Sequence, residues 1–268
     1  MRFERFSLLA FLFVSGLAWA QQPGASQQAT PPTPAPKDPQ AVSVLSQALA
    51  VAGGTTALAA VTDYTATGTV TYPASQTPAI TGTITISGRG LNQYRLDEVL
   101  PAGADSQIIS GGAIAVKTQA GGVVPVPFPA PVMAGATTLP CLHVAALSSD
   151  PNVMLIYKGI VSQGGLSLHD ILAVRMFPAQ QDPRGPFLEL GNAELFVDAS
   201  TFQLVTAQDT IRGGAVRSIQ YSNYQVVSGI AVPFIVTEQI NSGLTRHIQL
   251  SQISFNTGVQ ISAFDLSH

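Results

Sequence analysis

Histidine and cysteine are the most chemically versatile residues of this sequence, and there are few of them. The chain has one cysteine, Cys141, and one of its four histidines, His143, follows two positions later. A thiolate and an imidazole this close are two potential zinc ligands. Because zinc sites take three or four protein ligands, this pair does not complete one, and we expect no bound metal.

A second candidate is the dipeptide His169-Asp170, an imidazole next to a carboxylate. General bases use such pairs, but neighbouring residues of a strand face opposite sides of the sheet. The sequence also lacks a G-x-S-x-G elbow, an H-E-x-x-H helix, a phosphate-binding Gly-Lys-Ser/Thr loop and a Cys-x-x-Cys pair. We therefore expect no catalytic residue and no cofactor. A hydrolase with dispersed residues around His143 or His169 is the least favoured hypothesis.

Composition narrows the classes of partner. Only 10% of the residues are charged and the formal net charge is −3, so the sequence does not favour nucleic acid as a partner. With 46% apolar residues the chain can bury a large core. A single cysteine excludes an intramolecular disulfide, and we expect Cys141 to be a small buried residue, with a dimer through it as the alternative.

The first residues have the pattern of a secretory signal. A charged start, Met1–Arg5, precedes the apolar run Phe6–Ala18 and a small-x-small site that ends at Ala20. This run is too short to span a membrane comfortably, and no comparable run follows. We expect a signal peptide over residues 1–20, cleavage after Ala20, and an exported, periplasmic or extracellular protein without a transmembrane segment.

Residues 21–37 are rich in proline, glutamine, alanine and threonine. Such a segment buries too little apolar surface to offset the entropy lost on ordering, so we expect a disordered linker. The remaining residues, 38–268, then form one domain.

A helix is predicted at the start of that domain. Asp38 can cap a helix with Pro39 at its first position, and Gly53-Gly54 can end it. Apolar residues recur between them at helical spacing: Val42, Leu45, Leu49 and Ala52. A second short helix is expected over Thr56–Val61.

Two strands follow, over Tyr64–Tyr72 and Ile80–Ser87, in which apolar residues alternate with threonine or serine. Gly68 and Gly82 fall on the apolar face. We interpret them as sites of a sheet bend or a packing adjustment; the alternative is close approach by a helix or a ligand.

The C-terminal stretch Arg217–Phe264 predicts three antiparallel strands joined by short turns. Its third strand changes parity near Ser251-Gln252, which predicts a bulge, and Pro233 fits an edge strand or a bulge. Between these N-terminal strands and the C-terminal stretch we expect further strands, over Leu91–Leu100, Gln107–Ser110, Ala113–Thr118, Val123–Val126, Asn152–Ser162, Leu172–Pro178, Leu188–Val197 and Leu204–Ile211.

The proline-rich, apolar loop Val123–Pro140 leads into the apolar helical segment Leu139–Ser149. We interpret this insertion as a static plug that completes the core, with a lid over an apolar cavity as the alternative. If such a cavity exists, its predicted ligand-contacting residues are apolar positions of the first strands and of the insertion: Val70, Ile84, Phe128, Met133, Leu139, Leu142 and Leu147.

The order of these elements resembles the outer-membrane lipoprotein-sorting (LolA/LolB-like) superfamily. The resemblance includes the closing motifs Tyr221-x-x-Tyr224 and Gly229-Ile230-x-x-Pro233-Phe234, and Phe264. It implies a mainly β (α+β) fold: a strongly curved antiparallel sheet, or half-barrel, with the N-terminal helix and the loop-helix insertion packed in its concave face. It also implies a cavity that holds lipid or acyl chains.

The favoured hypothesis is therefore an exported, non-catalytic protein that binds a hydrophobic ligand, a lipid or acyl chain, in the concave face of the sheet. The alternative is a structural module of the cell envelope that binds another envelope protein through a sheet edge or an exposed face.

Overall fold

The computed structural model of the chain divides into two compact units, Met1–Pro31 and Pro32–His268. The residues it describes all lie in the second unit: 34–73, 78–90, 93–110, 113–118, 121–126, 138–176, 189–211, 214–241 and 243–265. The predicted signal peptide and most of the predicted linker fall outside the described residues, as do Phe128 and Met133.

The described residues of the second unit form few helices and many strands. The helices are α1 (Pro39–Val51), α2 (Gly54–Ala59), α3 (Pro140–Ser149) and a short 3-10 helix, η1 (Ile261–Phe264). The strands are β1 (Asp63–Tyr72), β2 (Ile80–Arg89), β3 (Gln93–Leu100), β4 (Gly103–Ser110), β5 (Ala113–Lys117), β6 (Val123–Val126), β7 (Val153–Gln163), β8 (Leu166–Met176), β9 (Glu189–Asp198), β10 (Leu204–Ile211), β11 (Ala215–Val227), β12 (Ile230–Ile240) and β13 (Leu244–Phe255).

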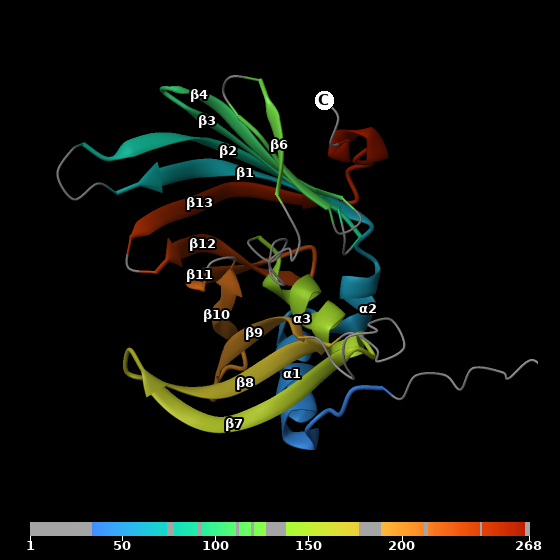
Figure 1. The fold of residues 1–268 in the computed structure, drawn as a ribbon. Coiled ribbons are helices and arrows are strands. Elements are labelled where there is room, and N and C mark those ends of the chain that lie inside the picture. Colours follow the sequence, from blue (N-terminus) through green and yellow to red (C-terminus); the bar gives the residue numbers. More distant parts are fainter. Residues whose placement is uncertain are drawn as a thin grey trace, which may run out of the picture. The chain divides into compact units, whose positions relative to one another are not determined.

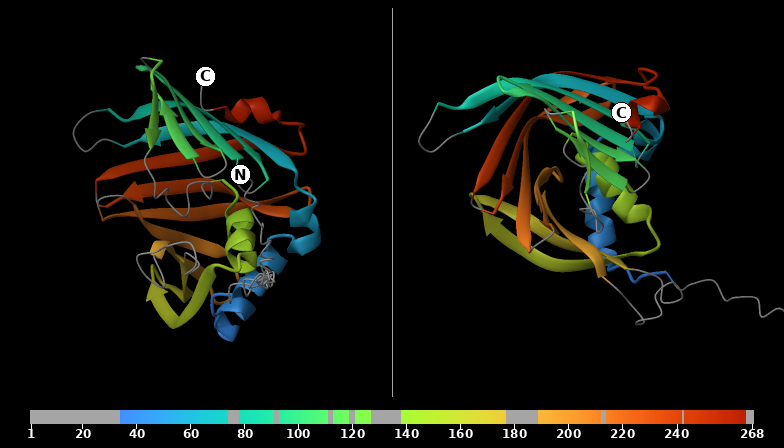
Figure 2. Two further views of the ribbon diagram at one scale, coloured as in Figure 1. Left: turned by 45° about the vertical axis from the view of Figure 1, so that its right-hand side comes forward. Right: turned by 45° about the horizontal axis from the view of Figure 1, so that its top comes forward.

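All these strands belong to one 13-stranded sheet in the order β6-β5-β4-β3-β2-β1-β13-β12-β11-β10-β9-β8-β7. Each neighbouring pair is antiparallel, and the sheet is open because β6 and β7 lie at its two edges. Figures 1 and 2 show the sheet curling around α1 and α3, which lie on its concave side. The predicted fold, a curved antiparallel sheet with helices in its concave face, is confirmed.

The predicted alternation of β1 and β2 places one face of each strand in the core. Ala66 and Val70 of β1, and Ile84 and Ile86 of β2, are buried, while the threonines between them point away from the core. The two strands pair along their whole length. Threonine suits the outer face because its branched side chain fits a pleated, half-exposed surface.

The predicted bulge in β13 is present. Thr67 of β1 pairs with Gln252 and Gly68 pairs with Leu250, so Ser251 is the extra residue. A Cβ atom on Gly68 would lie 2.2 Å from the carbonyl oxygen of Gln249. Glycine is therefore needed at this position because the backbone of β13 comes too close for any side chain. Gly82 is similarly close to the backbone of β3. Both glycines allow close packing of neighbouring strands, which agrees with the interpretation favoured from the sequence. Neither makes room for a helix or a ligand.

Pro233 belongs to a strand in the middle of the sheet, so the prediction of an edge strand is wrong. The register of β12 with β13 covers only Ile235–Ile240, whereas Pro233 pairs with Tyr224 of β11 alone. In the same half of β12, the backbone N–H of Ala231 donates to the carbonyl oxygen of Ala52, at the end of α1 (3.1 Å). The sheet thus opens where the helices join it, and a residue without an N–H is tolerated there.

Helix α1 begins as predicted. The carboxylate of Asp38 accepts hydrogen bonds from the backbone N–H groups of Gln40 (2.7 Å) and Ala41 (3.4 Å). The predicted stripe was partly wrong, because Val42 is 41% exposed and lies at the margin of the buried face. The residues that face the sheet are Ala41, Val44, Leu45, Ala48 and Leu49.

The last residues before α1 run along an edge of the sheet. Lys37 forms a parallel bridge with Leu155 of β7, and the N–H of Ala35 donates to the carbonyl oxygen of Pro151 (2.8 Å). The described end of the predicted linker is therefore held by β7, which explains how α1 is fixed against the sheet.

Two strands begin earlier than predicted. β8 starts at Leu166 instead of Leu172, because Gly164 and Gly165 both adopt positive φ (58° and 80°) and form a two-residue turn after β7. β4 likewise starts at Gly103 instead of Gln107. The longer β8 contains the His169-Asp170 pair.

Candidate functional site

A cavity of about 490 Å³ lies among the three helices and the adjoining ends of the sheet. Its lining residues are Leu49, Thr55, Leu58, Ala59, Val61, Gly90, Leu142, Ala145, Ser148 and Ser149. None of these side chains is charged, and most are apolar. The volume falls within the range of about 300–1,000 Å³ that is usual for small-molecule sites.

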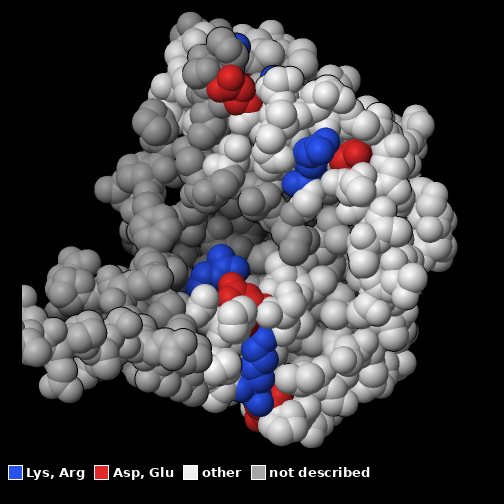
Figure 3. Space-filling view, turned by 90° about the vertical axis from the view of Figure 1, so that its right-hand side faces the viewer, with Lys and Arg blue, Asp and Glu red and all other residues white. Residues whose placement is uncertain are grey.

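Charged groups lie beside this cavity, at the end of α3. The ammonium group of Lys37 donates to the carbonyl oxygen of Ser148, where a positive charge complements the partial negative charge of a helix C-terminus. Asp150, just after the helix, forms an ion pair with Arg175 (3.3 Å). Figure 3 shows this face of the molecule hollowed, with basic and acidic side chains adjoining one another around the hollow. Among the described residues, the charged ones therefore lie beside the cavity and do not line it.

A smaller recess of about 30 Å³ adjoins the cavity, since both are lined by Gly90 and Leu142. The recess is more polar, and its remaining lining residues are Tyr64, Gln93, Tyr94, Leu139 and His143. A space of this size holds about one water molecule or one hydroxyl group. A large apolar space and a small, more polar one therefore lie next to each other.

His143 supplies an unused hydrogen-bonding atom to the recess. Its Nε2 is buried and has no hydrogen-bond partner among the described residues. Burial, aided by the positive charges of Arg175 and Arg217, lowers the pKa of His143 to about 3. The imidazole is therefore neutral at pH 7, and one of its ring nitrogens can accept a hydrogen bond while the other donates.

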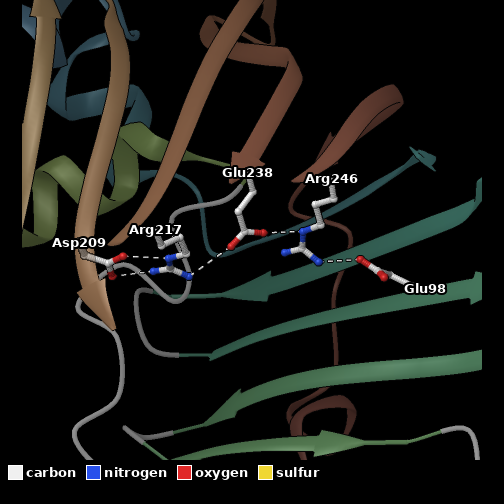
Figure 4. A network of polar contacts seen from close by, with 5 residues as sticks. All are labelled: Glu98, Asp209, Arg217, Glu238 and Arg246. Atoms are coloured by element: carbon white, nitrogen blue, oxygen red, sulfur yellow. Dashed lines mark hydrogen bonds and ion pairs between the residues drawn. The ribbon is translucent and has the colours of Figure 1, made fainter. Parts of the chain in front are cut away.

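The concave face carries a second polar feature, five charged side chains that we call the charge ladder (Figure 4). Arg217 binds Asp209 through two contacts of 2.9 and 2.7 Å and reaches Glu238 at 3.6 Å. Arg246 contacts Glu238 at 2.5 Å and Glu98 at 2.6 Å. Acids and bases therefore alternate across β10, β11, β12, β13 and β3.

The charge ladder lies at the strand ends remote from α1 and α2. Asp209 is near the end of β10 and Glu238 near the end of β12, whereas the helices join β12 at its beginning. The hydroxyl of Tyr72, the last residue of β1, donates to Glu98 (2.5 Å). Burial and the neighbouring carboxylate raise the pKa of Tyr72 to about 12. This end of the concave face is closed by paired charge.

No family model matches the sequence, and no curated protein matches it either. Solved structures do match its fold. A LolA superfamily protein from Nitrosomonas europaea is 12% identical, with a TM-score of 0.55, over 84% of this chain and 97% of that protein. A putative outer membrane lipoprotein-sorting protein domain from Vibrio parahaemolyticus is also 12% identical, with a TM-score of 0.51, over 85% of this chain and 97% of the domain.

The chain has the LolA fold. A DUF1329 family protein from Desulfovibrio piger has the same architecture, with 10% identity and a TM-score of 0.55 over 85% of this chain and 98% of that protein. At these identities the likeness concerns the fold alone. Among the described residues of this LolA fold, no helix is both long and apolar enough to cross a membrane.

Within the LolA fold, only some of the residues predicted to contact a ligand line the cavity or the recess. Leu142 lines the cavity and the recess, and Leu139 lines the recess. Val70, Ile84 and Leu147 are buried in the core and line neither space. Phe128 and Met133 lie outside the described residues.

Sequence reasoning missed most of the lining of both spaces. Leu58 was placed in a short helix but not at a site, and Tyr64 and Tyr94 were placed in strands. A signal for the position of these tyrosines exists, because Gly88 of β2 pairs with Tyr64 on one side and with Tyr94 on the other. A glycine between two aromatic residues lets a neighbouring ring pack over it, and the ring of Tyr64 does so.

The other histidine candidate faces a different part of the concave side. Nδ1 of His169 lies 2.9 Å from the hydroxyl of Tyr157, and its ring stacks on Phe202. Asp170 points to the opposite face, where Lys158 pairs with it (3.3 Å). The two neighbours therefore do not form a pair, as expected for a strand.

Cys141 is buried against α1, and burial raises the pKa of its thiol to about 12. Its position fits the predicted small buried residue. Among the described residues, no group of three or more His, Cys, Asp or Glu side chains is placed to hold a metal ion.

Proposed function

We propose that this protein is an exported, non-catalytic carrier or receptor that binds the apolar part of a lipid or acyl chain in the cavity among α1, α2 and α3. One observation carries the proposal: a space of about 490 Å³ whose described lining residues are all uncharged. Burying apolar ligand surface yields about 25 cal/mol per Å², so about 250 Å² would contribute about 6 kcal/mol.

The comparisons support the same class of function. The matched domain from Vibrio parahaemolyticus is described as lipoprotein-sorting, and lipoproteins carry acyl chains. We further propose that the chain acts in the periplasm after cleavage behind Ala20. An apolar ligand needs a protein to cross that aqueous space.

The ligand would contact Leu142 and Leu139 in the observed arrangement of helices. Val70, Ile84 and Leu147 are buried by core packing and line neither space, so the ligand would reach them only if the core opened. Phe128 and Met133, which lie outside the described residues, remain proposed contacts.

The test is to fill the cavity. Ala145→Trp places an indole among the lining residues, whereas Ala50→Trp places one on the exposed side of α1. We expect purified wild-type protein to enhance the emission of an apolar dye and to carry lipid in native mass spectrometry. Ala145→Trp should weaken dye binding at least tenfold, and Ala50→Trp should leave it within twofold. Equal binding by both variants, or no dye binding by the wild type, would refute the proposal.

The second candidate function is a module that binds an envelope protein through the edge of β7. Beyond the part covered by residues 35–38, this edge strand exposes Ile160 (60%) and Ile156 (36%). Exposed apolar edge strands accept an added strand from a partner. A partner that binds wild-type protein but not Ile160→Lys, while the variant still binds dye, would favour this function.

A further inference from the structure

We propose that the cavity selects an amphiphile whose polar group is uncharged, such as the glycerol hydroxyls and ester of a glyceride, and that the recess at His143 receives one oxygen of this group. The inference rests on the proposed function and adds the class of ligand. It follows from the position of the recess, from its hydrogen-bonding groups and from the placement of charge around it.

The recess adjoins the apolar cavity, so we propose that one ligand occupies both. Gly90 and Leu142 line both spaces. The cavity takes an acyl chain by volume, and the recess of about 30 Å³ takes one oxygen-bearing group. An oxygen there would leave water, and that loss has to be offset by hydrogen bonds from the protein.

The recess provides such hydrogen bonds. Nε2 of His143 is buried and without a partner among the described residues, and Gln93 brings an amide. Tyr64 and Tyr94 bring hydroxyl groups. An imidazole, an amide and two hydroxyls can donate and accept, which matches a hydroxyl or an ester carbonyl.

The tyrosines are held in place by the sheet. Tyr64, Gly88 and Tyr94 lie side by side on β1, β2 and β3. A Cβ atom on Gly88 would lie 2.2 Å from the ring of Tyr64 and 2.8 Å from its hydroxyl oxygen, so the ring rests directly on the glycine. The polar end of the site is thus built into rigid strands.

Charge is absent from the described lining of both spaces. The two arginines whose charge is felt at His143 are paired elsewhere, Arg175 with Asp150 and Arg217 with Asp209 and Glu238. Neither arginine lines the recess. A carboxylate or phosphate in the recess would lose water without gaining a cation, which costs more than burial of a neutral group.

The test uses ligands with the same 16-carbon chain and different polar groups. Monopalmitoylglycerol, palmitate and palmitoyl lysophosphatidylglycerol compete, below their micelle concentrations, with a bound apolar dye at pH 7. We expect the neutral monopalmitoylglycerol to bind at least tenfold tighter than palmitate or the lysophospholipid. Equal or tighter binding of either anion would overturn the inference while leaving the proposed function intact. Failure of all three ligands and of the dye would refute both.

Variants of the recess give a second readout. His143→Leu should weaken the binding of monopalmitoylglycerol about fivefold to tenfold, which corresponds to the loss of one hydrogen bond. His143→Gln, which restores a polar group, should recover most of that affinity. Tyr64→Phe keeps the ring and removes only the hydroxyl, so it should fold and weaken the same ligand about threefold. If neither Tyr64→Phe nor His143→Leu changes the preference over palmitate, the recess does not select the ligand and the inference is wrong.

Discussion

The two ends of the concave face are chemically opposite. At the helix end, the cavity is lined by uncharged residues and leaves about 490 Å³ of space. At the far end, Arg217 and Arg246 of the charge ladder are bracketed by three carboxylates. Both features lie on the core-facing side of the strands.

The difference shows how the two ends of one largely apolar face can differ in polarity. Arg217 continues the parity of Ile219 and Tyr221, and Glu238 continues that of Val236, so charged residues replace apolar ones at inward positions near these strand ends. An apolar ligand would lose contact with water at the helix end and meet desolvated charge at the other. The fold therefore offers such a ligand one end only.

The largest effect should come from breaking the ladder. Arg217→Met leaves Asp209 buried without its cation and leaves Glu238 with Arg246 alone, so we expect a loss of about 3–5 kcal/mol in the free energy of unfolding, measured by urea denaturation. The control is Arg95→Met, whose pair with Asp97 is about one third exposed and should be worth about 1 kcal/mol or less. Equal losses in the two variants would show that the ladder is not buried as described.

A smaller effect is expected at the polar recess of the helix end. Gly88→Ala places a methyl group 2.2 Å from the ring of Tyr64, so the ring has to shift, at a cost of about 1–3 kcal/mol. The control, Gly122→Ala, meets nothing closer than 3.9 Å and should change stability by about 0.5 kcal/mol or less. A wild-type melting curve for Gly88→Ala would contradict the close packing of Tyr64 on β2.

The pH dependence of stability should report the burial of His143. The folded protein binds the His143 proton with a pKa of about 3, whereas the unfolded chain binds it near 6.5, so the unfolded state holds more protons between these values. Stability is therefore lost as the pH falls below about 6.5, by up to about 1.4 kcal/mol per pH unit. Between pH 6.5 and 5, His143→Leu should flatten this slope. An unchanged slope would mean that His143 is solvated.

Local sequence patterns predicted much of the sheet. The apolar and threonine faces of β1, the cap at Asp38 and the bulge at Ser251 each depend on residues close together in the chain. The errors arose where distant segments meet. Pro233 was assigned to an edge because the sequence does not show that β12 leaves β13 to bond with the end of α1.

The candidate site was harder to predict for the same reason. Leu142 was identified from its apolar segment, but the pairing of Tyr64, Gly88 and Tyr94 requires the register of three strands. The charge ladder was missed entirely. It joins Glu98 to Arg246, which are 148 positions apart, and no periodic pattern links such residues.

Photolabelling tests the contrast between the two ends most directly. A palmitoyl glyceride with a diazirine on its acyl chain is bound to the protein and irradiated, and the labelled peptides are mapped by mass spectrometry. We predict label in residues 54–61 and 138–149, which include the lining of the cavity, and its loss when excess monopalmitoylglycerol competes. Competable label concentrated in residues 209–217 or 238–246, around the charge ladder, would contradict the account.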